Sequence, residues 1–81
     1  MTSVQYHIVE IQNRADGINN VLPIETRNSK QTGLSYFYER CSKMAGTTLF
    51  PSVTVMLIDS EGTILDKKHL TTAWEPEAAA E

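Results

Sequence analysis

The clearest pattern of apolar and polar residues lies between Pro51 and Leu70, where an apolar run, a turn sequence and a second short apolar run predict a β-hairpin. Residues 53–58 are apolar or β-branched throughout, which is typical of a strand in the interior of a sheet. A turn sequence follows at 59–62, where Gly62 suits the left-handed position that ends a three-residue loop.

A loop made of residues 60–62 also predicts the register of this hairpin. Ile58 then lies near Ile64 and Leu57 near Leu65. One face carries Val53, Val55, Leu57 and Leu65, and the other carries Thr54, Met56, Ile58 and Ile64, followed by Asp66 and Lys68. The first strand is apolar on both faces and is expected at the centre of its sheet. The second becomes charged at 66–69, as edge strands do to discourage pairing with other chains.

The N-terminal third predicts two more strands. Residues 3–12 form the first, with Val4, Tyr6 and Ile8 on one face and Val9 and Ile11 on the other, so a central position is expected. A turn follows at 13–17, which ends in an Asp-Gly pair. Residues 20–27 form the second strand, and its proline at position 23 cannot donate a ladder hydrogen bond, so this strand belongs at an edge.

The hydrophobic period changes to that of a helix between residues 29 and 45. The apolar stripe is Leu34, Phe37, Tyr38, Cys41, Met44 and Ala45. Asn28 and Gln31 have the spacing of a capping box, and Gly46 is a natural residue just past the end. Gly33 is unfavourable inside a helix, which places the predicted start nearer Thr32.

The predicted order of elements is β-β-α-β-β, which indicates an α+β fold. Short connections favour a four-stranded antiparallel sheet in the order 2-1-3-4, with one helix packed on one face. We expect residues 1–70 to form a single domain and residues 71–81 to form an acidic, flexible tail.

One helix leaves the second face of such a sheet open. That face would display Thr54, Met56, Ile58 and Ile64, together with either the Tyr6 set or the Val9 set of the first strand. Either Trp74 and the tail cover these residues, or another protein surface does.

Composition narrows the possible functions. The 81 residues are 41% hydrophobic with a net charge of −3, which argues against a nucleic-acid binder that relies on phosphate contacts. No apolar run approaches the roughly 20 residues that span a bilayer, and the N-terminus lacks the pattern of a signal peptide. A single cysteine excludes an intramolecular disulfide. These features predict a cytoplasmic protein.

No group of residues has the spacing of a catalytic or metal site. His7 and His69 lack further ligands at metal-binding spacings, so we expect neither metal nor cofactor. Cys41 lies on the apolar helix stripe and is expected to be a core thiol. Asp59 and Glu61 flank a hairpin tip, where carboxylates usually form turns. The sequence therefore predicts a protein without enzymatic activity.

The segment 25–70 resembles a group of small proteins from phages and mobile elements of Firmicutes. The resemblance rests on the aromatic residues 36–38 in the middle of the helix and on a strand that runs into a D-x-x-G-x-I-L sequence at 59–65. It covers more than half of the chain and implies a mobile-element origin. Anti-CRISPR proteins are similar to this chain in size and architecture.

Two functions are therefore expected. The first is a phage or prophage accessory protein that binds and inhibits a host protein, plausibly in a defence system; the alternative is a structural or regulatory domain that forms a homodimer through the open sheet face. The predicted partner-binding residues are Tyr36, Arg40, Met56, Ile58, Asp59, Glu61, Ile64, Asp66 and Trp74. The partner is a host protein or a second copy, without direct contact to nucleic acid or membrane.

Overall fold

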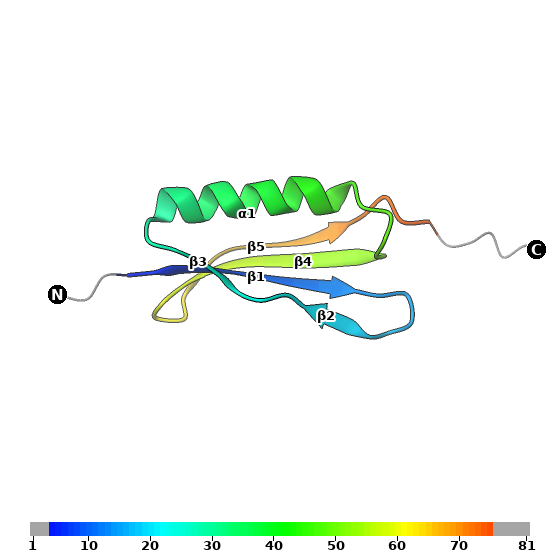
Figure 1. Ribbon diagram of the computed structural model, residues 1–81, viewed down its shortest axis with the longest axis horizontal. Coiled ribbons are helices and arrows are strands. Elements are labelled where there is room, and N and C mark those ends of the chain that lie inside the picture. Colours follow the sequence, from blue (N-terminus) through cyan, green and yellow to red (C-terminus); the bar gives the residue numbers. More distant parts are fainter. Residues whose placement is uncertain (1–3, 76–81) are drawn as a thin grey trace, which may run out of the picture.

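A computed structural model describes residues 4–75 as one helix packed on an antiparallel sheet (Figure 1). The elements in chain order are β1 (Tyr6–Asn13), β2 (Asn19–Val21), β3 (Glu25–Arg27), α1 (Lys30–Ala45), β4 (Ser52–Asp59) and β5 (Ile64–Thr71). The predicted α+β class is confirmed. The predicted flexible tail extends into residues 76–81, which lie outside the described range.

The sheet has five strands, and its details differ from the predicted four-strand arrangement. The path is β2-β1-β4-β5, and β3 pairs with β1 as well. The predicted edge strand at 20–27 is thus two short strands, which meet β1 at Ile11↔Val21 and at Ile8↔Glu25. Pro23 lies between them, and its missing N–H explains why the ladder is interrupted at this point.

The pairing of β4 with β5 contains a β-bulge that the sequence pattern does not reveal. Ile58 pairs with Ile64 as predicted, but Leu57 pairs with Asp66. Leu65 is therefore an extra residue, and every later position of β5 moves to the opposite face. The prediction that Leu57 lies near Leu65 is wrong, and so is the placement of Asp66 and Lys68 on the same face as Ile64.

The two hairpins close with the same loop geometry. In the first, the N–H of Arg14 donates to the carbonyl of Ile18; in the second, the N–H of Asp59 donates to the carbonyl of Thr63, both at 3.0 Å. Each loop has three residues and ends in a glycine with φ of +89°. The predicted three-residue loop at 60–62 and the predicted Asp-Gly turn are thus confirmed.

Helix α1 begins at Lys30, one residue after the start that a cap at Asn28 implies and two residues before the predicted start near Thr32. Ser29 is the N-cap, and its Oγ accepts a hydrogen bond from the N–H of Thr32 at 3.2 Å. The predicted capping box of Asn28 and Gln31 is therefore wrong, since Ser29 is the residue with the extended backbone that a cap needs. Gly46 follows the last helical residue, as predicted.

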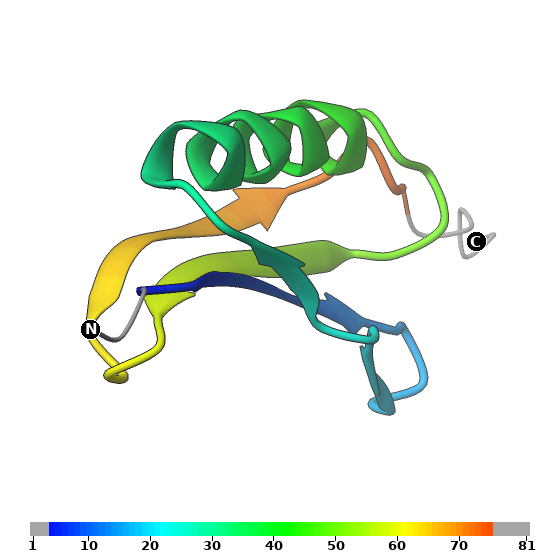
Figure 2. The same ribbon diagram turned by 60° about the vertical axis from the view of Figure 1, so that its left-hand side comes forward.

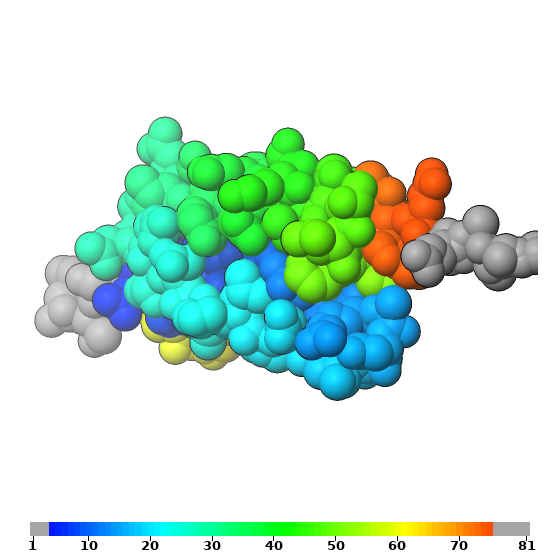
Figure 3. Space-filling model, turned by 45° about the vertical axis from the view of Figure 1, so that its right-hand side comes forward, coloured from blue at the N-terminus to red at the C-terminus, as the bar shows by residue number. Residues whose placement is uncertain are grey.

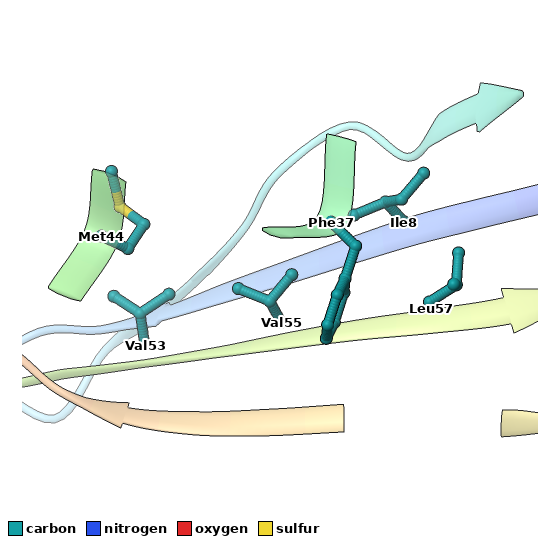
Figure 4. Close-up of a cluster of buried hydrophobic side chains, with 6 residues drawn as sticks. All are labelled: Ile8, Phe37, Met44, Val53, Val55 and Leu57. Carbon is teal, nitrogen blue, oxygen red and sulfur yellow. The ribbon is translucent and has the colours of Figure 1, made fainter. Parts of the chain in front are cut away.

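The hydrophobic core lies between α1 and the two central strands (Figure 4). Its members are Ile8, Phe37, Met44, Val53, Val55 and Leu57. Phe37 points from the helix toward the β4 side chains and is fully buried. Because β4 contributes half of this cluster and pairs with a strand on each side, its predicted central position is confirmed.

Gly33 lies inside α1, where the sequence pattern predicts a boundary. A Cβ at this position would lie 3.1 Å from the Cβ of Tyr6 and 3.4 Å from Cδ1 of Leu57. The glycine therefore lets the first turns of the helix approach β1 and β4 closely. This approach explains why a residue with low helix propensity is part of the helix.

The buried face of α1 is rotated from the predicted stripe. Gly33, Phe37 and Met44 are buried, whereas Tyr38 is 51% exposed and Ala45 is exposed. A polar contact under the helix accounts for this rotation. Arg40, one turn past Phe37, reaches β1 and binds Glu10. Its Nε donates to Oε1 at 2.6 Å, and its Nη2 donates to Oε2 at 2.9 Å.

The Glu10–Arg40 pair is an ion pair within the core layer. Glu10 is 4% exposed, and Gln12 donates a further hydrogen bond to its Oε2 at 2.7 Å. The carboxylate raises the pKa of the Arg40 guanidinium above its ordinary value, mainly through their hydrogen bond and against the opposing effect of burial. The helix is thus fixed on the sheet by a two-bond charged contact as well as by apolar packing.

We expect Gly33→Val to destabilise the fold although valine has the better helix propensity. The added methyl groups would meet Tyr6 and Leu57 and force them apart, at a cost of about 1–3 kcal/mol. Urea unfolding measures this loss. The control is Ser35→Val on the exposed side of the same helix, and equal stabilities of the two variants would contradict the proposed close packing.

We expect Arg40→Met to lower the free energy of unfolding by about 3–5 kcal/mol, because it leaves the Glu10 carboxylate buried without its positively charged partner. The double variant Glu10→Leu/Arg40→Met removes both charges and should lose much less. Denaturant titration of the wild type, Arg40→Met and the double variant tests this expectation. A double variant as unstable as Arg40→Met would show that the unpaired carboxylate does not cause the loss of stability.

Candidate functional site

The face of the sheet opposite α1 has no other element of residues 4–75 lying on it (Figure 2). Ile8, Glu10 and Gln12 of β1 are buried under the helix, so strand alternation turns His7, Val9 and Ile11 away from it. The sequence pattern left open whether the Tyr6 set or the Val9 set faces outward; it is the Val9 set. We call this surface the open face.

A band of apolar side chains crosses the open face diagonally. Three cross-strand pairs define it: Ile58↔Ile64, Val9↔Met56 and Ile11↔Val21. We call it the open-face stripe; its members are Val9, Ile11, Val21, Met56, Ile58 and Ile64. It therefore runs from β5 through the centre of the sheet to β2. Val21 and Ile64 at its ends are 64% and 56% exposed.

A histidine–threonine pair lies on each side of the open-face stripe. His7 Nδ1 is 2.9 Å from Thr26 Oγ1, and His69 Nδ1 is 2.8 Å from Thr54 Oγ1. Both pairs join neighbouring strands, β1 to β3 and β4 to β5, at directly opposed positions. The histidine and threonine side chains beside the stripe thus bond to each other. The apolar residues of the stripe are the groups on this face that lack a partner within the described chain.

Among the described strand residues, Lys67 is the one that places a formal charge on the open face. It pairs with Met56 across β4 and β5. The carboxylates of the described strands lie elsewhere. By register, the helix side of the sheet holds Glu10, Glu25, Asp59 and Asp66. An acidic chain therefore has one face without carboxylates on its strands.

The structure brings together some of the predicted partner-binding residues and separates others. Met56, Ile58 and Ile64 all belong to the open-face stripe. Asp66 lies on the opposite side, where its Oδ2 accepts a hydrogen bond from Tyr38 at 3.3 Å. The two sets do not form one surface, because the β-bulge at Leu65 directs them to opposite faces.

The two carboxylates at the hairpin tip differ in their surroundings. The Oδ1 of Asp59 accepts hydrogen bonds from the N–H groups of Glu61 and Thr63, both at 2.9 Å, so this carboxylate stabilises the turn. Glu61 is exposed at the tip. Neither residue belongs to the open-face stripe.

Tyr36 and Arg40, two of the predicted partner-binding residues, are not exposed side by side. Tyr36 packs against the core, and the guanidinium of Arg27 lies 4.6 Å from its ring centre in a cation–π contact. Arg40 is bound to Glu10, and its side chain is 16% exposed. Tyr38 is the tyrosine that lies exposed on the helix, because α1 is rotated as described above.

The segment after β5 is bonded to the connection between α1 and β4. The hydroxyl of Thr72 donates to the carbonyl of Phe50, and the N–H of Ala73 donates to the carbonyl of Thr47. Trp74 is half-buried beyond this point. These bonds direct residues 72–75 past the end of the sheet, as Figure 1 shows, so their backbone does not cross the central strands.

The described residues offer few of the features that metal, ligand or membrane sites use. Residues 4–75 contain no group of three or more His, Cys, Asp or Glu side chains that could hold a metal ion, and no pocket opens on their surface. Helix α1 is not long and apolar enough to cross a membrane. Cys41 packs against the core, and burial raises the pKa of its thiol.

The sequence pattern missed part of the site. Val21 was not singled out, because its strand is only three residues long and its alternation is broken at Pro23. The spacing of His7 and His69 in the sequence does not reveal their cross-strand threonine partners. Directly opposed His and Thr positions could have been found once the correct register was known.

We expect Cys41 to react with iodoacetamide several-fold more slowly in the folded protein than in the urea-unfolded chain. The raised pKa keeps less of the thiol ionised, and the thiolate is the reactive form. The difference should shrink as the pH rises toward the pKa of the thiol. Mass spectrometry of timed samples measures both rates, and equal rates near neutral pH would contradict this description of the thiol.

The comparisons with known proteins give no family for the chain. No protein-family model matches it, and neither a curated protein nor a solved structure does. The case for its function therefore rests on the open face and on the residues that surround it.

Proposed function

We propose that this protein is a non-enzymatic binding module that acts by placing its open sheet face against another protein surface. The observation that carries the proposal is the open-face stripe, a continuous apolar band that crosses the sheet from β5 to β2. An antiparallel sheet that faces water on one side normally places polar residues there. Contiguous apolar bands on a surface are typical of protein-binding sites.

The composition of the face supports a protein as the ligand. Its centre is apolar and its margins carry histidine, threonine and one lysine, which is the arrangement of an apolar interface core with a polar rim. A nucleic-acid surface would require several phosphate contacts, and the face offers a single formal cation among its described strand positions.

We place this activity in the cytoplasm of a host cell, where the partner is a host protein or a second copy of the chain. The likeness of segment 25–70 to small phage proteins suggests the first partner and an inhibitory role, plausibly in a defence system. The inhibitor would act by covering the surface that its target uses. The open-face stripe contains no carboxylate, so this contact does not depend on one.

Site-specific photo-cross-linking in the native cells tests the use of this face. A benzoylphenylalanine residue at Lys67 lies on the open face, and one at Lys43 lies on the exposed side of the helix as a matched control. We expect a defined cross-linked product from position 67 and none from position 43, because only the first lies beside the stripe.

The mass of the product identifies the partner. A product of twice the 9.1 kDa chain contains a second copy, and any other defined mass contains a foreign protein. No product from position 67, or equal products from both positions, would overturn the proposal that the open face is the binding surface.

A further inference from the structure

We infer that the occupant of the open face is a second copy of this chain, packed face to face about a two-fold axis that runs along the open-face stripe. This inference rests on the proposed use of the open face and adds the identity of the partner. Two sheets stacked in this way form a four-layer assembly with the helices outside, and their inner faces lie about 10 Å apart.

The stripe is complementary to itself. A two-fold axis in the plane between the sheets and along the stripe places the apolar band of one copy over the same band of its partner. Val9 and Met56, which pair at the centre of the sheet, would lie closest to the axis. An isologous contact needs such a self-matching pattern, because the same patch serves both copies.

The flanks of the stripe also match under this rotation. The axis carries the side that holds Thr54 and His69 over the side of the partner that holds His7 and Thr26. Each polar flank therefore meets a polar flank, and each has a histidine–threonine bond of its own. Lys67 lies on one side of the stripe, so the two copies of this lysine are carried to opposite sides and do not meet.

The absence of carboxylates on the described strands of the open face favours this arrangement further. No acidic side chain of those strands has to lose its hydration when the two faces meet, and unpaired buried carboxylates are costly. On the open face, the formal charge of the described strand positions is a single lysine at an outer strand, where a long side chain can reach water.

The area of the face reaches the lower limit for a biological interface. Strands of eight residues are about 26 Å long, and four strand positions span about 19 Å, which gives a flat footprint of about 500 Å² per copy. Two copies would bury about 1,000 Å² in total, without the additional surface of protruding side chains. This area reaches the minimum size of a biological interface.

The described C-terminal segment does not compete for this place. Hydrogen bonds to Phe50 and Thr47 hold residues 72 and 73 at the end of the sheet near the C-terminus of α1. The space-filling view shows residues 71–75 in orange beside the end of the green helix (Figure 3). The stripe therefore remains available on the central strands.

Light scattering on a sizing column tests the inference with the purified full chain at high micromolar concentration. We expect a mass twice that of the 9.1 kDa chain. Ile58→Glu and Ile64→Glu, both on the stripe, should halve this mass. Leu49→Glu is the matched control; Leu49 is 73% exposed in the connection before β4, and this variant should remain a dimer.

Circular dichroism and urea unfolding show whether each variant is folded. Ile64 is 56% exposed, so Ile64→Glu should fold even where Ile58→Glu does not. A monomeric wild-type protein would overturn the inference. A dimer that persists in folded Ile64→Glu would overturn it as well, because the contact would then lie elsewhere.

The position of the axis has its own test. In a Cys41→Ala background, Met56→Cys lies on the stripe and Thr26→Cys lies on the open face away from it. A short bismaleimide should join two copies of the first variant and not of the second. Equal cross-linking of both variants would contradict an axis along the stripe.

These outcomes separate the inference from the proposed function. A monomer whose position 67 still cross-links to a foreign protein in cells would remove the second copy as the partner and retain the open face as the binding surface. A monomer without any cross-linked product would remove both.

Discussion

A single helix can cover one face of this sheet and not two, and the rest of the structure follows from that constraint. Helix α1 has 16 residues and is about 24 Å long, close to the about 26 Å of the eight-residue strands beneath it. The match lets the helix cover the core residues of β1 and β4 along their whole length. Each central strand must therefore supply a buried face and a face that the helix cannot reach.

The buried face is less apolar than a core of this size would suggest. β1 contributes Glu10 and Gln12 to it beside Ile8, and all three are buried. Apolar packing comes mainly from β4, while β1 fixes the rotation of α1 through the bonds of Glu10 to Arg40. Such a pair is a directional contact, and it explains why Tyr36 turns toward the core while Tyr38 turns toward water.

Local rules predicted the elements whose causes are local. The glycine of the 60–62 loop, the pairing of Ile58 with Ile64 and the edge position of the segment that contains Pro23 all follow from the preferences of single residues. The rotation of α1 could not be predicted, because it depends on a contact between residues 10 and 40 that no local pattern encodes.

The candidate site was predictable in part for the same reason. Alternation groups Met56 with Ile58, but it cannot decide which face of β1 the helix covers, since both Ile8 and Val9 are apolar. The bulge at Leu65 is hidden because residues 66–69 are all polar, so their pattern does not show which of them face the helix. As a result, the carboxylate of Asp66 was assigned to the wrong face.

That bulge has a consequence for comparing this chain with others. A related sequence without the extra residue would keep the same strand pairing but would be one position shorter after its loop. An alignment without a gap at Leu65 would then place residues that face the helix opposite residues that face away from it. Substitution patterns in β5 would appear random in such an alignment, although each face followed its own consistent rule.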